Sequence, residues 1–209
     1  LAVVYIKQKK TQAALQQLNA WINLKPEDSR GYLLRSRLRM EENQLDKAIQ
    51  DLQQATTIDS QNYEIWQWLG QIYYRQGQYQ EAVRAFYRVL ELNPNLVETH
   101  LDMALVQHAL SQKEEAIVHY ENFLNHLPDD FQANYYLGLI YREMGQIDLA
   151  LEYFLKAEKK DPNQSDLLEE LGNLYLDQNN LEEARIRLLR ADQRSVANIT
   201  NLGVIAKRR

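Results

Sequence analysis

Residues 63–96 read YEIWQWLGQIYYRQGQYQEAVRAFYRVLELNPNL, and the pattern of this segment recurs along the chain. Its Ala82 belongs to a series of alanines that lie 34 residues apart. The series comprises Ala14, Ala48, Ala82, Ala116, Ala150 and Ala184. A fixed period of about 20 to 50 residues is the signature of a solenoid, in which equivalent units stack along one axis. The sequence therefore predicts a row of similar units and not a globular domain around a single core.

Each unit contains two stretches of helical periodicity. In the quoted unit, Leu69, Ile72 and Tyr73 share one spacing of three and four residues, and Ala82 and Phe86 begin a second such stretch. This spacing places apolar side chains on one face of a helix. Between the two stretches stands a turn residue, most often one that tolerates left-handed backbone. The turn residues are Asn43, Gly77, Ser111, Gly145 and Asn179. We expect two helices in each unit, no strands, and far more than the average third of residues in helices.

The quoted unit resembles the tetratricopeptide repeat, whose pattern is W-x2-L-G-x2-Y, then A-x3-F, then P. The matching residues are Trp66, Leu69, Gly70, Tyr73, Ala82, Phe86 and Pro94. The resemblance implies an all-α fold, a right-handed superhelical solenoid of antiparallel helix pairs. Stepping by the period, we expect residues 1–209 to form a single array. Its parts are a partial repeat 1–28, the repeats 29–62, 63–96, 97–130, 131–164 and 165–198, and the start of a further repeat, 199–209.

Composition excludes several classes of protein. Apolar residues make up 45% of the chain and charged residues 25%, as in ordinary soluble proteins. The net charge of −5 argues against nucleic-acid binding. No apolar run approaches the ~18 residues of a membrane span, and we recognise no signal peptide. The absence of cysteine fits a cytoplasm or a periplasm, of which we favour the cytoplasm. Because the chain does not begin with Met, we expect both ends to be cut from a longer protein.

The sequence carries no motif typical of catalysis. The histidines are His100, His108, His119 and His126, and their spacing matches no zinc-protease motif. A metal site or pH switch among them is the weaker hypothesis beside ordinary helix positions. Phosphate-binding and nucleophile motifs are also absent. We therefore expect no catalytic residue, no metal site, no cofactor and no enzymatic activity.

One unit departs from the pattern, because Arg35 and Arg39 occupy places where the repeat has Leu and Tyr. With Arg30 and Arg37, four arginines lie within ten residues. Three interpretations stay open. The arginine stems could cover apolar neighbours such as Trp21. The arginines could instead form a basic patch for an acidic partner or phosphate. The helix could also be shifted in register.

In the family that the chain resembles, the first helices of the pairs line a concave groove that binds partner peptides. The repeat register then gives the groove-lining positions, among which Met40 and Asp102 also fall. The binding candidates are Arg37, Trp68, Gln71, Tyr74, Arg75, Leu101, Leu105, His108, Tyr135, Tyr136, Leu139, Arg142 and Asn173. Aromatic residues and arginine are typical of binding hot spots. The alternative for Trp68 and Tyr136 is that they pack between neighbouring hairpins.

The main functional hypothesis is a non-catalytic scaffold or adaptor that binds a peptide or segment of a partner protein in this groove. We expect Arg37, Arg75 and Arg142 to anchor acidic or carbonyl groups. The alternative is a repeat arm of a larger enzyme or envelope assembly, such as a glycosyltransferase, a polysaccharide-export component or a pilus-biogenesis component. A third hypothesis is end-to-end self-association, because apolar residues near 202–205 would be exposed at an uncapped end.

Overall fold

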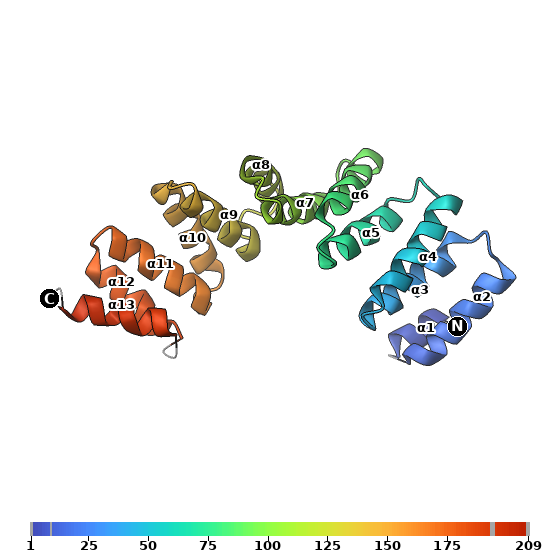
Figure 1. Ribbon diagram of the computed structural model, residues 1–209, viewed down its shortest axis with the longest axis horizontal. Coiled ribbons are helices and arrows are strands. Elements are labelled where there is room, and N and C mark those ends of the chain that lie inside the picture. The colour runs from blue at the N-terminus through green and yellow to red at the C-terminus, as the bar shows by residue number, and fades with distance from the viewer. Residues whose placement is uncertain (1, 9, 193–194, 208–209) are drawn as a thin grey trace. The chain divides into compact units, whose positions relative to one another are not determined.

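A computed structural model describes residues 2–8, 10–192 and 195–207, and these form thirteen helices and no strand. The predicted all-α fold class is confirmed. Contacts between Cα atoms divide the chain into two compact units, Leu1–Gln112 and Lys113–Arg209. Each unit is built from helices joined by short turns (Figure 1). The ends of the predicted array at Leu1, Arg208 and Arg209 lie outside the described residues.

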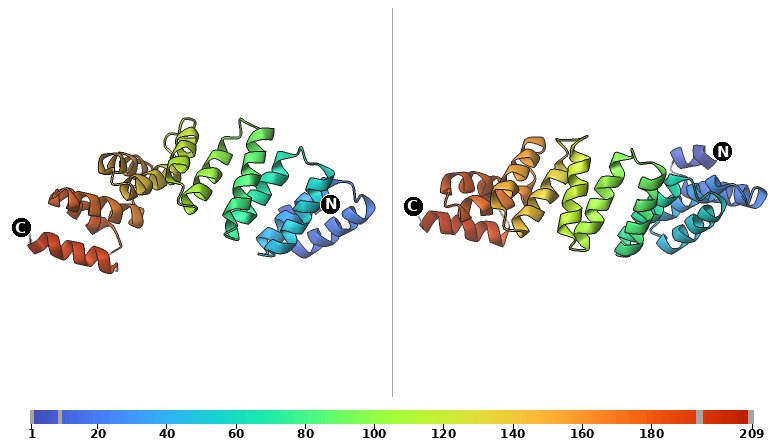
Figure 2. Two further views of the ribbon diagram at one scale, coloured as in Figure 1. Left: turned by 45° about the horizontal axis from the view of Figure 1, so that its top comes forward. Right: turned by 90° about the horizontal axis from the view of Figure 1, so that it is seen from above.

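Unit 1 consists of consecutive helices that pack in sequence order. They are α1 (Ala2–Lys7), α2 (Thr11–Leu24), α3 (Ser29–Glu41), α4 (Leu45–Ile58), α5 (Tyr63–Arg75), α6 (Tyr79–Leu92) and α7 (Val97–Ala109). The pairs α3/α4 and α5/α6 make the most extensive contacts, and α4 then packs on α5 and α6 on α7. Figure 2 shows these pairs as antiparallel hairpins.

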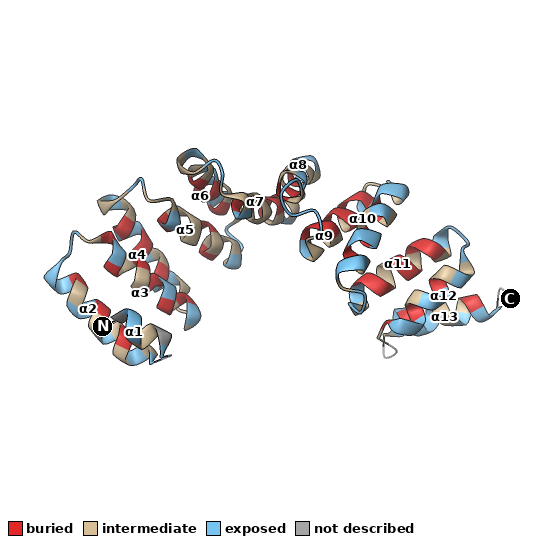
Figure 3. Ribbon diagram, turned by 180° about the vertical axis from the view of Figure 1, so that it is seen from behind, coloured by how far each residue is buried: buried red, intermediate tan, exposed pale blue. Residues whose placement is uncertain are grey.

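Unit 2 repeats the arrangement. Its helices are α8 (Lys113–Leu124), α9 (Phe131–Glu143), α10 (Ile147–Lys160), α11 (Ser165–Asp177), α12 (Leu181–Arg190) and α13 (Val196–Lys207). The hairpins are α9/α10 and α11/α12, with α8 packed on α9 and α13 on α12. In both units the buried residues lie on the faces that neighbouring helices turn toward each other (Figure 3).

The period of the sequence reappears in the starts of the helices. First helices begin at 29, 63, 97, 131 and 165, and second helices at 11, 45, 79, 113, 147 and 181. The last helix breaks this spacing, because α13 begins at Val196 and not at 199. The buried Asn198 ties the first turn of α13 to the end of α12. Its side-chain amide donates hydrogen bonds to the backbone carbonyls of Leu188 and Asp192 at 2.9 and 3.1 Å.

Small residues explain how the paired helices approach each other. All six alanines of the series are 0% exposed. At Gly70, a Cβ atom would lie 2.5 Å from Cε1 of Phe86, so any side chain there would collide with the ring. The turns are equally specific, because all five predicted turn residues have a positive φ, from 57° at Asn179 to 74° at Gly145. Local chemistry also begins several helices: the side chains of Asp28, Asn62 and Asp130 accept hydrogen bonds from first-turn amides.

Candidate functional site

The thirteen binding candidates share one property, which is that none of them is fully buried. They lie on the first helices α3, α5, α7, α9 and α11. Arg37 and Arg75 are exposed, and the other eleven are partly exposed. The repeat register therefore selects accessible positions on these helices. The candidates of unit 1 and those of unit 2 form separate groups.

In unit 1, several candidates line a pocket of about 350 Å³. Its lining residues are Met40 of α3, Trp68, Gln71, Tyr74 and Arg75 of α5, Phe86 of α6, and Asp102 and Leu105 of α7. Five of these eight are binding candidates. Leu101 and His108 lie on the same helix as Leu105 but do not line the pocket.

Met40, Phe86 and Asp102 were not among the candidates. A signal for two of them was present, because Met40 and Asp102 occupy the same repeat positions as Tyr74 and Trp68. Phe86 fills a core position and is 1% exposed. Its ring lies close to Gly70, and an edge of it reaches the pocket.

Trp68 takes part in both packing and the pocket wall. Its ring packs against the buried cluster formed by α3 to α6, as the packing alternative predicts. The guanidinium of Arg37 lies over the same ring, with its carbon 5.7 Å from the ring centroid. This distance is within the range of a cation–π contact. Arg37 is therefore placed beside the pocket although it does not line it.

The carboxylate of Asp102 sits in a small hydrogen-bonded network. The side-chain amide of Gln67 donates to Oδ2 of Asp102, and Nε2 of Gln71 donates to the same oxygen at 3.3 Å. The hydroxyl of Thr99 donates to Oε1 of Gln67 at 3.1 Å, which fixes the orientation of that amide. Burial raises the pKa of Asp102, the two glutamine amides partly offset this effect, and the charge of Glu98 adds to it.

In unit 2, Tyr135 and Tyr136 belong to an aromatic cluster. Their ring centroids are 5.7 Å apart, and Tyr136 stacks on Tyr120 of α8 at 6.2 Å. The ring centroid of Tyr135 lies 5.8 Å from that of Phe131 and 5.9 Å from that of Phe154. Burial raises the pKa of Tyr135. Packing between helices therefore covers part of both tyrosine side chains, and the rest of each stays exposed.

The polar candidates of unit 2 already have partners within the unit. Arg142 forms an ion pair with Glu170 of α11. The Oδ1 atom of Asn173 accepts a hydrogen bond from Nδ2 of Asn201 at 2.6 Å. Leu139 is partly exposed on the same helix as Arg142. A partner carboxylate at Arg142 would have to compete with Glu170.

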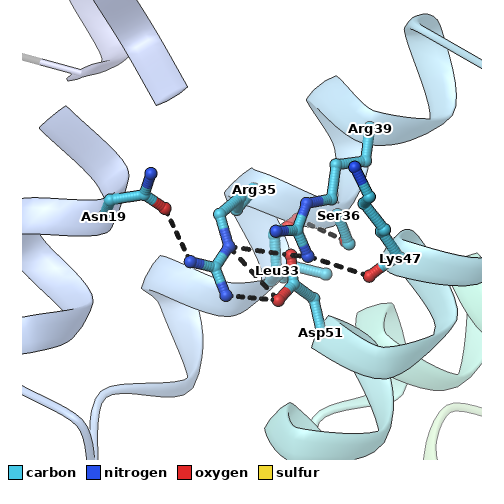
Figure 4. A network of polar contacts seen from close by, with 7 residues as sticks. All are labelled: Asn19, Leu33, Arg35, Ser36, Arg39, Lys47 and Asp51. Atoms are coloured by element: carbon cyan, nitrogen blue, oxygen red, sulfur yellow. Dashed lines mark hydrogen bonds and ion pairs between the residues drawn. The ribbon is translucent and has the colours of Figure 1, made fainter. Parts of the chain in front are cut away.

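A buried carboxylate explains the two unusual arginines of α3. Arg35 and Arg39 both bind Asp51 of α4, which is 3% exposed (Figure 4). The helix is not shifted, because α3 begins one period before α5. The basic-patch interpretation therefore fails for these two residues. Arg30 does lie over the ring of Trp21, at 5.7 Å, and its hydrogen bonds lower the pKa of Asp28 to about 2.

Among residues 2–8, 10–192 and 195–207, no three His, Cys, Asp or Glu side chains are grouped so that they could hold a metal ion. In the same part of the chain, no helix combines the length and apolar character needed to cross a bilayer.

Three family models match parts of the chain. The TPR repeat matches residues 37–77, the Tetratricopeptide repeat matches residues 63–96, and Anaphase-promoting complex, cyclosome, subunit 3 matches residues 111–191. Tetratricopeptide repeat protein 8 from Homo sapiens is 30% identical over 152 residues, which cover 70% of this chain and 27% of that protein. Superkiller complex protein 3 from Homo sapiens is 28% identical over 137 residues, which cover 59% of this chain and 9% of that protein. The chain thus spans less than a third of the length of these relatives.

Two solved structures share the fold over nearly their whole length. YrrB, described as a TPR protein with an unusual peptide-binding site, has a TM-score of 0.75 and 22% identity, covering 92% of this chain and 98% of its own. PilW, described as a widely conserved type IV pilus biogenesis factor, has a TM-score of 0.78 and 20% identity, covering 97% of this chain and 95% of its own. At these identities the likeness establishes the fold alone.

Proposed function

This chain is a tetratricopeptide-repeat protein, and from that premise we propose that it binds a segment of a partner protein through the accessible faces of its first helices. Proteins built from this repeat typically serve as scaffolds without catalysis. In this proposal the chain is a non-catalytic adaptor, and the thirteen candidates make the contacts.

The pocket of unit 1 is the observation that carries the proposal. It brings together Trp68, Tyr74 and Leu105, which offer apolar and aromatic surface, with the exposed guanidinium group of Arg75 at its wall. Interfaces draw most of their binding free energy from a few aromatic and arginine residues in such pockets. The peptide-binding site described for YrrB supports the proposal by analogy of fold. The exposed parts of Tyr135 and Tyr136 would supply the contact surface of unit 2.

The test is partner capture with paired variants. We expect the double variant Trp68→Ala and Tyr136→Ala to lose at least about tenfold in captured partner, because two hot-spot truncations each cost more than ~1 kcal/mol. The matched control is Tyr87→Ala with Val118→Ala, which removes two exposed apolar side chains, 49% and 55% exposed, from second helices. Circular dichroism must show unchanged helix content in both. Equal capture by both double variants would refute the proposed binding face.

A second candidate function is that of an arm within a larger assembly or enzyme, such as one of pilus biogenesis, polysaccharide export or glycosyl transfer. It is supported by the small share of the relatives' length that the chain spans, 27% and 9%. The complete reading frame of the gene tests it. A frame that encodes no further domain would remove this candidate.

End-to-end self-association also remains a proposal. The residues that the sequence predicted to be exposed are not, because Ile205 is 2% exposed and Leu202 and Val204 are only partly exposed. The exposed apolar residues of α13 are instead Val196 and Ile199, at 79% and 55%. Such apolar surface could be covered by another copy of the chain. Sedimentation at increasing concentration would then show a rising mass, whereas a constant monomer mass would contradict it.

A further inference from the structure

We infer that the pocket beside Trp68 receives a cationic side chain of the partner segment, a lysine or an arginine, whose charged end pairs with the carboxylate of Asp102. This inference rests on the proposed function and names the chemistry that the same pocket recognises. It assigns a role to Asp102, which the binding candidates do not include.

The hydrogen bonds of Asp102 leave one of its oxygens available. Both glutamine amides, from Gln67 and Gln71, donate to Oδ2. Oδ1 accepts no hydrogen bond from any residue among those that the structure describes. Because both glutamine amides donate to the same oxygen, they hold the carboxylate in a fixed orientation. The residue itself lines the pocket, so a donor that enters the pocket can reach it.

The charges around Asp102 favour a positive occupant. A carboxylate that is taken out of water is destabilised unless a cation or hydrogen-bond donors compensate it. In the described part of the chain, Asp102 forms no ion pair, and the neighbouring charge that acts on it is that of Glu98. Arg75 lines the same pocket without pairing with Asp102, and Arg37 lies over the ring of Trp68. A partner's cation would therefore supply what the chain itself does not.

The walls of the pocket suit the stem of such a side chain. Met40, Leu105 and Trp68 present apolar surface, and lysine and arginine bury their methylene stems along surfaces of this kind. Trp68 and Tyr74 add aromatic faces, which attract cations. The volume of about 350 Å³ lies at the lower end of the range for ligand sites, which fits one side chain and not a large ligand.

The experiment uses three small probes of similar length on the intact chain at pH 7. They are n-butylammonium, 1-pentanol and butanoate. Binding is followed by the NMR signals of the side-chain amides of Gln67 and Gln71 and of the indole of Trp68. We expect n-butylammonium to shift these signals and to bind about tenfold more tightly than 1-pentanol, because a hydrogen bond to a charged group is stronger than one between neutral groups. Butanoate should not bind.

Two variants and a pH series attribute the effect to Asp102. Asp102→Asn should remove the preference for n-butylammonium over 1-pentanol. Glu91→Gln is the matched control, since it removes one negative charge from an exposed position of α6 in the same unit. It should keep the preference. In the wild-type chain, the preference should fall as the pH is lowered through the raised pKa of Asp102, because protonation removes the charge. This last measurement needs no variant and holds even if Asp102→Asn fails to fold.

The outcomes separate this inference from the proposed function. Equal binding of n-butylammonium and 1-pentanol would overturn the inference and leave an apolar docking pocket. Preferential binding of butanoate would also overturn it and would point to Arg75 as the anchor. If no probe shifts the signals, the inference is overturned, while the capture experiment with Trp68→Ala and Tyr136→Ala still decides the proposed function.

Discussion

The hairpins α3/α4 and α5/α6 have the same helix lengths and the same connections, yet they fill three equivalent places with opposite chemistry. In α5/α6 these places hold Leu69, Tyr73 and Ala85, of which Leu69 and Ala85 are 3% exposed. In α3/α4 they hold Arg35, Arg39 and Asp51. One hairpin closes by apolar packing, and the other closes around a buried carboxylate.

The geometry of the charged hairpin explains how it is tolerated. Arg35 donates to Asp51 through Nε to Oδ2 at 3.0 Å and through Nη2 to Oδ1 at 2.6 Å. Nη1 of Arg39 lies 2.8 Å from Oδ2 of Asp51. Nη1 of Arg35 donates to Oδ1 of Asn19 at 2.6 Å, and the same Nη1 of Arg39 also donates to the carbonyl of Lys47 at 3.0 Å (Figure 4). Burial lowers the pKa of Arg39, and the nearby charge of Asp51 opposes that shift. The comparison teaches that the repeat fixes the shape of a hairpin and not the chemistry that closes it.

The largest expected effect is produced by removing the central acid. Asp51→Ala leaves two guanidinium groups, 16% and 20% exposed, without their carboxylate. Removing one partner of a buried ion pair costs about 3–5 kcal/mol in the free energy of unfolding. Urea titration followed by tryptophan fluorescence measures this, because all three tryptophans, Trp21, Trp66 and Trp68, lie in unit 1.

The control for Asp51→Ala is an exposed ion pair of the same unit. Glu91 pairs with Arg88 at 2.8 Å, and its side chain is 64% exposed. Glu91→Ala should cost less than ~1 kcal/mol, as exposed ion pairs do. If the two variants lost the same stability, the carboxylate of Asp51 would not be the closing element of its hairpin.

A triple exchange tests whether the two hairpins are interchangeable. Arg35→Leu, Arg39→Tyr and Asp51→Ala together give α3/α4 the residues of α5/α6. Replacing a buried ion network by apolar residues is often neutral or stabilising by about 1–4 kcal/mol. We expect a free energy of unfolding between the wild-type value and ~4 kcal/mol above it, from the same urea titration. A loss larger than ~2 kcal/mol would mean that the charged network fits its surroundings in a way that the apolar set cannot.

A change at the contact between the two helices tests the apolar hairpin. Gly70→Ala should cost about 1–3 kcal/mol, because the new methyl group collides with the buried ring of Phe86. In α3/α4 the equivalent residues are Ser36 and the smaller Leu52, and the hydroxyl of Ser36 donates to the carbonyl of Leu33 at 2.7 Å. The control is Gly203→Ala on α13, where no heavy atom of the described residues lies within 4 Å of the added carbon. That change should raise the thermal midpoint slightly, because alanine favours helix. A gain in both variants would contradict the close contact at Gly70.

Much of the fold could be predicted because it depends on neighbours in the chain. Helical spacing, turn residues and a recurring alanine are local properties, and they predicted the helical class, the positive φ angles at the turns and the buried alanines correctly. The same register chose accessible positions for the candidate site, including Trp68, Gln71, Tyr74, Arg75 and Leu105 of the pocket. The basic-patch interpretation of Arg35 and Arg39 failed, because Asp51 stands in the neighbouring helix, at a position that the repeat pattern does not mark.

The sequence by itself determined the period, the helix pairs and the side of each helix that solvent can reach. Only the tertiary structure decided which polar groups meet: Arg35 with Asp51, Arg142 with Glu170, and Asp102 with the amide of Gln67. The physical reason is that a repeat fixes backbone positions, whereas a hydrogen bond between helices depends on side-chain rotamers and on what packs around them.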